Sequence, residues 1–220
     1  AIREDCPVKG VEDTKGGAKV VTADGGFTFD RVVVAAGCWM RRVLPGIGAQ
    51  VHPTRQQMAF YEVTDADTDL FSEKKLPVWG VDTYKDIEHG YGWYGFPVLR
   101  EGYVKISNDF RSEQVDPDDH RENTKEFLRL TDEFVKQRMP KLAKARFAGG
   151  RSCFYEHTSD WDFLIDRAPG FQRVVVAGGG SGHGFKFGGS IGPVIADTVE
   201  EKPNALAAPF RVGKRFATLR

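Results

Sequence analysis

Two short apolar runs, each followed by glycine, stand near opposite ends of the chain. Val32-Val33-Val34-Ala35-Ala36 precedes Gly37, and Val174-Val175-Val176-Ala177 precedes Gly178. A continuous apolar run of this length is typical of a strand buried on both faces, as in a parallel sheet. The first run also closes a predicted hairpin, in which 18–22 and 27–36 are the arms and Asp24-Gly25-Gly26 is the turn.

The middle of the chain follows a different pattern, with strands interrupted by polar residues. The expected strands are 57–63, 78–83, 90–95 and 103–109, and their spacing favours an antiparallel or mixed sheet. Asp116-Pro117-Asp118-Asp119 predicts the entry of a helix that runs to about Arg138, with Phe127, Leu130, Phe134 and Val135 on one face. Pro140 is expected to end it.

Near Gly37 the pattern predicts a short helix over 39–44, stopped by Pro45. After the middle section, a short strand over 163–166 precedes the second apolar run, and a helix is expected over 188–200. Two parallel-type strands with antiparallel material between them indicate one domain interrupted by another. The expected fold class is α/β (α+β), with 1–45 and 159–220 in one domain and 46–158 in the other.

Composition removes several classes of function. The chain has 220 residues, with 31 basic and 31 acidic side chains, and this balance gives no support to nucleic-acid binding. No apolar run approaches the ~20 residues that cross a bilayer. Cys6, Cys38 and Cys153 form no CxxC pair or zinc spacing, which predicts no metal site and a reducing, cytoplasmic setting, or a peroxisome in a eukaryote. The chain begins with Ala1, which suggests a piece of something longer.

The strongest chemical signal is the glycine-rich stretch 178–184. A strand, glycines and then a helix allow backbone N–H groups to approach an anionic ligand. Neither GxGxxG nor the Walker spacing is present, so a tight turn that needs positive φ is the structural alternative. A nicotinamide-binding Rossmann protein stays a weaker alternative, because no complete fingerprint is found.

Several segments, in order along the chain, resemble those of the FAD-dependent amine oxidases of the sarcosine oxidase and D-amino-acid oxidase type. Ser181 to Phe187 (SGHGFKF) is similar to the family's C-terminal flavin-contacting segment, and Cys153-Phe154-Tyr155 to its flavin-linking segment. Val32 to Trp39 (VVVAAGCW) resembles a second signature. Further matches are Asp162 to Asp166, Tyr94-Gly95-Phe96-Pro97, Lys105 and Pro209-Phe210-Arg211 to Arg215-Phe216.

The resemblance implies a partial Rossmann-like FAD-binding domain and a largely antiparallel substrate domain. The family's first βαβ unit, which binds the ADP half of FAD, has no counterpart in this chain, so a missing N-terminal segment is an expected partner. The resemblance also implies cofactor contacts by these residues: Cys153, Gly37, Trp39, Gly180, Ser181, Gly182, His183, Gly184, Phe185 and Lys186.

The same resemblance assigns chemical roles. Cys153 would form a thioether to the flavin, against the alternative of a small buried hydrophobe. Lys105 would hold a positive charge for oxygen reduction, unless it is a strand lysine in solvent. Lys186 would bind the substrate carboxylate, and His183 would lie near the flavin or substrate, unless it is a satisfied turn histidine. Tyr94 and Tyr155 would shape the amine pocket or belong to the core.

The implied reaction is oxidation of the C–N bond of a secondary or primary amino acid to an imine, with oxygen reduced to hydrogen peroxide. Alternatives are a flavin dehydrogenase with another electron acceptor and a non-catalytic ligand-binding module of the same fold. The substrate stays open, because Ser107-Asn108-Asp109 stands where the family often has a histidine after the lysine.

Overall fold

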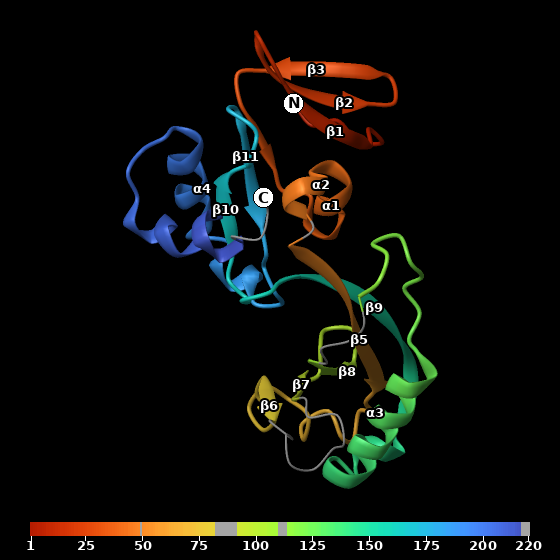
Figure 1. Ribbon diagram of the computed structural model, residues 1–220. Coiled ribbons are helices and arrows are strands. Elements are labelled where there is room, and N and C mark those ends of the chain that lie inside the picture. Colours follow the sequence, from red (N-terminus) through yellow and green to blue (C-terminus); the bar gives the residue numbers. More distant parts are fainter. Residues whose placement is uncertain (49, 82–91, 110–113, 217–220) are drawn as a thin grey trace. The chain divides into compact units, whose positions relative to one another are not determined.

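The computed structural model describes residues 1–48, 50–81, 92–109 and 114–216. The chain forms two compact units, which are described separately below (Figure 1). Unit 1 comprises 1–53 and 155–220, and unit 2 comprises 54–154.

A three-stranded mixed sheet lies at the centre of unit 1. It consists of β10 (Leu164–Arg167), β11 (Val174–Gly178) and β4 (Val32–Val34), in that order. β4 and β11 are parallel, with Val32 opposite Val174, so the predicted parallel strands are confirmed, and the two apolar runs also pair with each other.

The expected burial of the first apolar run on both faces is wrong for the described residues. Val34 is buried in the core of unit 1, whereas the side chain of Val33 is 41% exposed. β4 is the last strand in its sheet, and successive side chains of a strand point to opposite faces. One face of β4 therefore contributes to the core while the other is partly open.

The N-terminal residues of unit 1 form a separate antiparallel sheet of β1 (Val8–Thr14), β2 (Gly17–Thr22) and β3 (Gly25–Phe29). The first arm of the predicted hairpin is confirmed, but the turn lies at Ala23 and Asp24, since Gly25 and Gly26 already pair in β3, and the predicted second arm is too long. The chain leaves the sheet after Phe29, and Val32 begins a strand of the other sheet by donating its N–H to the carbonyl of Arg173 at 2.9 Å.

Helices cover the sheet of unit 1. The predicted helix at 39–44 is present as η1 (Gly37–Trp39) and α1 (Met40–Val43), and Pro45 begins a further turn, α2 (Pro45–Gly48). This placement is reasonable because proline is favoured at the first position of a helix. The helices after β11 are η3 (Gly184–Phe187), α4 (Ile191–Val199), η4 (Ala205–Phe210) and η5 (Gly213–Phe216).

Unit 2 is built on a five-stranded sheet in the order β6-β7-β8-β5-β9. The strands are β5 (Val51–Glu62), β6 (Trp79–Val81), β7 (Trp93–Phe96), β8 (Tyr103–Asn108) and β9 (Arg146–Thr158). The pairs β6–β7, β7–β8 and β5–β8 are antiparallel, as predicted. The parts of two predicted strands at 82–83 and 90–91 lie outside the described residues. β9 was not predicted, because its glycines and polar residues hide its alternation.

The long helix α3 (Lys125–Arg138) packs against one face of this sheet. Its predicted apolar face is confirmed, because Phe127, Leu130, Phe134 and Val135 are all buried. Its predicted start is wrong. The helix begins after Thr124, whose hydroxyl accepts the N–H of Phe127 at 3.2 Å, and a short helix η2 (Leu142–Lys144) follows it.

The described residues include no helix long and apolar enough to cross a membrane.

We predict that Phe134 is a main source of stability in unit 2. Its buried ring stacks on Trp93 and Trp79, with centroids 4.6 and 5.8 Å away. Phe134→Ala should lower the free energy of unfolding of the full-length protein by about 3–5 kcal/mol, because it leaves a cavity. Phe147→Ala is the control: that ring is 44% exposed, so its loss should be clearly smaller. Equal losses in urea unfolding would contradict this assignment.

Candidate functional site

β8 divides its side chains between the two faces of the unit 2 sheet. Val104 and Ile106 are buried in the core against α3, so Lys105 lies on the opposite face. Its half-buried ammonium lies 4.7 Å from the ring centroid of Phe96 and 5.7 Å from that of Tyr94. Two predicted site residues, Lys105 and Tyr94, are therefore brought together on the face away from α3.

Cys153, on β9, lies close enough to Lys105 for each group to act on the other's pKa. Burial raises the pKa of the Cys153 thiol, and the charges of Lys105, Arg151 and Arg121 oppose this rise. Burial lowers the pKa of Lys105, while a Cys153 thiolate would raise it. Nearby cations favour the reactive thiolate, but here they offset only part of the effect of burial, so the pKa of the Cys153 thiol stays above its usual value.

Two arginines beside Phe154, the residue after Cys153, were missed by the sequence analysis. The ring of Phe154 lies between Arg121, with its guanidinium carbon 3.5 Å from the centroid, and Arg55, at 5.3 Å. Arg55 is buried, pairs with Asp119 and donates to the carbonyl of His120 at 2.6 Å. These contacts hold the segment before α3 in a loop, which explains why the helix does not begin at Asp116. Arg55 belongs to a polar run, Thr54 to Gln57, that the structure buries, and no sequence pattern marks that burial.

In unit 1 the glycine-rich stretch forms a tight turn after β11. Gly179, Ser181 and Gly182 have φ of 73°, 44° and 81°, so the backbone uses the left-handed region that glycine favours. A Cβ at Gly182 would lie 2.6 Å from the ring of Tyr155. The turn therefore places Tyr155 directly against the predicted cofactor segment.

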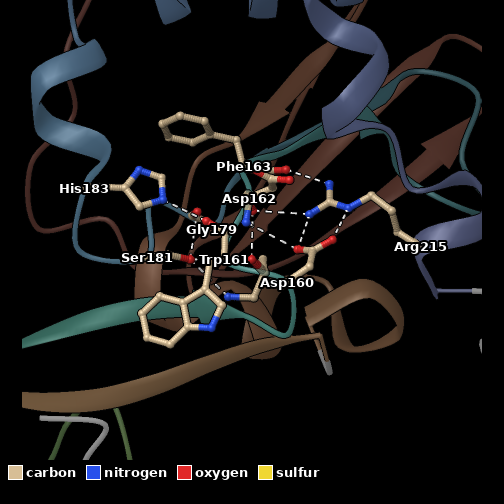
Figure 2. Close-up of polar contacts among 9 residues, drawn as sticks. Asp160, Trp161, Asp162, Phe163, Gly179, Ser181, His183 and Arg215 are labelled. Atoms are coloured by element: carbon tan, nitrogen blue, oxygen red, sulfur yellow. Dashed lines mark hydrogen bonds and ion pairs between the residues drawn. The ribbon is translucent and has the colours of Figure 1, made fainter. Parts of the chain in front are cut away.

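Polar groups of the protein fix this turn from within (Figure 2). The Ser181 hydroxyl donates to the carbonyl of Gly179 at 3.1 Å and accepts the N–H of Thr158 at 3.3 Å. The Nε2 atom of His183 lies 2.7 Å from the carbonyl oxygen of Trp161. Because a carbonyl can accept but not donate, this nitrogen carries a proton. His183 thus has a fixed orientation, which leaves its predicted role toward flavin or substrate untested.

The remaining predicted residues lie on two turns at the C-terminal ends of the parallel strands. After β4, Gly37 has φ of 53°, and Trp39 is 41% exposed. After β11, Gly180 and Gly184 precede Phe185, whose side chain is fully exposed. Lys186 is also exposed, with its ammonium 5.5 Å from the Phe187 ring centroid. In open α/β sheets this end of the strands is where nucleotide ligands bind.

Glu156 is a further residue of this region that the sequence analysis did not identify. Its Oε1 atom accepts the N–H of Gly180 at 3.3 Å, and burial raises the pKa of its carboxyl group. No sequence pattern marks a lone glutamate in a strand as part of a site. A glycine-lined region with a buried polar atom fits a cofactor that has both a phosphate-bearing chain and hydroxyl groups.

Within the described residues, no group of three or more histidine, cysteine, aspartate or glutamate side chains is arranged to hold a metal ion.

Comparisons with known proteins agree on one family. The family model described as FAD dependent oxidoreductase (DAO) matches residues 1–198. N-methyl-L-tryptophan oxidase from Escherichia coli O1:K1 / APEC is 28% identical over 214 residues, which are 96% of this chain and 54% of that protein. The protein of the same name from strain K12 / DH10B matches to the same extent. The chain thus spans about half the length of these relatives.

Solved structures show the same fold. Fructosamine oxidase (Amadoriase II) from Aspergillus fumigatus matches with a TM-score of 0.75 and 26% identity, over 93% of this chain and 50% of that one. Amadoriase I from the same organism, a fructosyl amine:oxygen oxidoreductase, matches with a TM-score of 0.78 and 22% identity, over 97% and 50%.

We predict that Lys105 sets the reactivity of Cys153. In cofactor-free full-length protein, Lys105→Met removes the charge that most opposes the raised thiol pKa, so the pH midpoint of Cys153 alkylation should move upward. Lys105→Arg is the control, because it keeps a positive charge. The readout is peptide mass spectrometry, which separates Cys153 from Cys6 and Cys38. An unchanged or lower midpoint in Lys105→Met would refute the interaction.

Proposed function

We propose that this chain, which belongs to the DAO family of FAD dependent oxidoreductases, supplies cofactor-binding and substrate-facing residues of an FAD-dependent amine oxidase. The proposed reaction is oxidation of the C–N bond of a secondary or primary amino acid, with oxygen as the electron acceptor. The observation that carries the proposal is the position of Lys105, which lies on the face of the unit 2 sheet away from α3 and near enough to Cys153 to act on its pKa. The names of two matched proteins, N-methyl-L-tryptophan oxidase and fructosamine oxidase, support this reaction.

The two units would divide the work. Unit 1 would be the Rossmann-like part that holds FAD at the C-terminal ends of β4 and β11, and unit 2 would be the substrate domain. Cys153 would attach the cofactor covalently through its sulfur. The turns that would contact it contain Gly37, Trp39, Gly180, Ser181, Gly182, His183, Gly184, Phe185 and Lys186.

When bound, FAD supplies the two-electron redox chemistry, and the side chains bind, orient and provide charge. The half-buried ammonium of Lys105 would stabilise negative charge that develops on oxygen. Lys186 would bind the substrate carboxylate through a charge-assisted hydrogen bond. Tyr94 and Tyr155 would border the amine, each with its ring packed against the protein. The substrate would enter with a neutral amine, so no strong general base is required.

Covalent attachment is tested by intact mass of the denatured full-length protein together with its visible spectrum. We expect a mass increment equal to FAD, which Cys153→Ser abolishes because the attaching sulfur is gone. Cys38→Ser is the control, since Cys38 is buried elsewhere, in unit 1. An increment that survives Cys153→Ser would exclude this attachment, and a protein without flavin absorbance would reject the proposed function.

Lys186 gives a second test, measured as peroxide release. Lys186→Met should reduce kcat/KM for an N-methyl amino acid by about tenfold to a hundredfold, because a hydrogen bond to a charged group contributes roughly 1.5–3 kcal/mol. Lys186→Arg should keep most of the activity. The matched control is an N-methyl amine without a carboxylate, which should be unaffected. If both substrates lost activity equally, Lys186 would not be the carboxylate-binding residue.

A further inference from the structure

One oxygen of the Glu156 carboxyl group has a partner and the other has none. Oε1 accepts the N–H of Gly180 at 3.3 Å, and the backbone of Gly179 also contributes a hydrogen bond to the carboxyl group. Oε2 is fully buried and has no hydrogen-bond partner among the described residues. Leaving a buried polar atom unsatisfied costs about 1–3 kcal/mol, so such an atom usually belongs to a functional site.

The surroundings of Oε2 belong to the two turns that follow the parallel strands. A Cβ at Gly178, the last residue of β11, would lie 3.0 Å from Oε2, and one at Gly37, after β4, would lie 4.0 Å away. The methyl group of Met40 would lie 3.2 Å from the same Cβ at Gly178. Oε2 therefore faces half-buried glycine backbone and an apolar methyl group, at the end of the sheet where open α/β proteins bind ligands.

These contacts favour the neutral form of the Glu156 carboxyl group. Burial raises the pKa of the carboxyl group, and the N–H groups of Gly180 and Gly179 lower it in part. No charged side chain of the described residues contributes to the shift. Because Oε1 accepts from the backbone, the proton of the neutral acid belongs on Oε2. The neutral side chain thus presents a hydrogen-bond donor to the region between the two turns.

We propose that Oε2 of Glu156 donates a hydrogen bond to an oxygen of the ribityl–diphosphate chain of bound FAD. Backbone N–H groups at glycine turns and strand ends are suited to bind that chain. Oxygens of the ribityl–diphosphate chain are therefore available acceptors for the proton on Oε2. This inference rests on the proposed function, since it requires that unit 1 binds FAD. It adds a cofactor-binding residue from β9 that is separate from Cys153.

A neutral acid at this position has a consequence for pH. The diphosphate is negatively charged, so an ionised Glu156 would repel it, and only the protonated form would donate. FAD binding would therefore take up a proton when the free protein has Glu156 ionised. Above the pKa of Glu156 in the free protein, the dissociation constant of FAD should rise by up to tenfold per pH unit.

The experiment uses the full-length protein with Cys153→Ser, so that FAD binds reversibly. The dissociation constant is measured by flavin fluorescence over the neutral and mildly alkaline range. Glu156→Gln keeps an acceptor for Gly180 and a donor toward the cofactor, so it should bind FAD within about threefold of the parent and lose the alkaline weakening. Glu156→Ala should bind about tenfold to a hundredfold more weakly. Glu12→Ala, at an exposed position of β1, is the control and should change nothing.

The outcomes separate the possibilities. If both Glu156 variants bind FAD as the parent does, with the same pH dependence, the proposal is wrong. If Glu156→Gln is as weak as Glu156→Ala and the parent shows no alkaline weakening, Glu156 is ionised and accepts, which also overturns it. Circular dichroism of the FAD-free proteins checks that Glu156→Ala is folded. If Glu156→Ala is unfolded, the pH dependence of FAD binding by the isosteric Glu156→Gln decides the proposal. If the parent itself binds no FAD, the proposed function fails first.

Discussion

The parallel pairing of β4 with β11 holds unit 1 together. It joins Val32–Val34 to Val174–Val176, two stretches separated by the whole of unit 2. Such a pairing must recover the entropy of closing a long loop, which it does through the buried valines of both strands. Once the strands are side by side, Gly37 and Gly178 come to the same end of the sheet. The candidate cofactor region of unit 1 is a direct result of that pairing.

Unit 2 depends on a different constraint, the two-residue period of β8. Val104 and Ile106 are committed to the core with Trp93 and α3, so Lys105 must occupy the other face. The ammonium is held between aromatic rings and near Cys153 without a carboxylate among the groups that shift its pKa. Packing of the core therefore fixes the position of the Lys105 ammonium, and the charge of that ammonium opposes the rise in the pKa of the Cys153 thiol.

The sequence predicted the features that rest on apolar patterns and on glycine. The parallel strands, the antiparallel middle sheet and the buried face of α3 were all expected from periodicity. The start of α3 was not, because Asp116–Asp119 has the composition of a helix entry but is held as a loop by contacts with Arg55, which is distant in sequence. β9 was missed because its glycines and polar residues hide the alternation of its side chains. Glu156 could not be found from the sequence, because its significance lies in the absence of a partner for one atom.

β9 carries Cys153 in unit 2 and Tyr155 and Glu156 in unit 1, within four consecutive positions of one strand. Alternation puts Cys153 and Tyr155 on one side of the strand and Phe154 and Glu156 on the other. Substitutions in this segment change one group at a time. Insertion or deletion of a single residue would instead exchange the sides, turning the thiol, the phenol and the carboxyl group away from their neighbours together. The length of this segment is therefore constrained as well as its sequence. Homologous chains should differ in the residues of the segment but not in the number of residues between them.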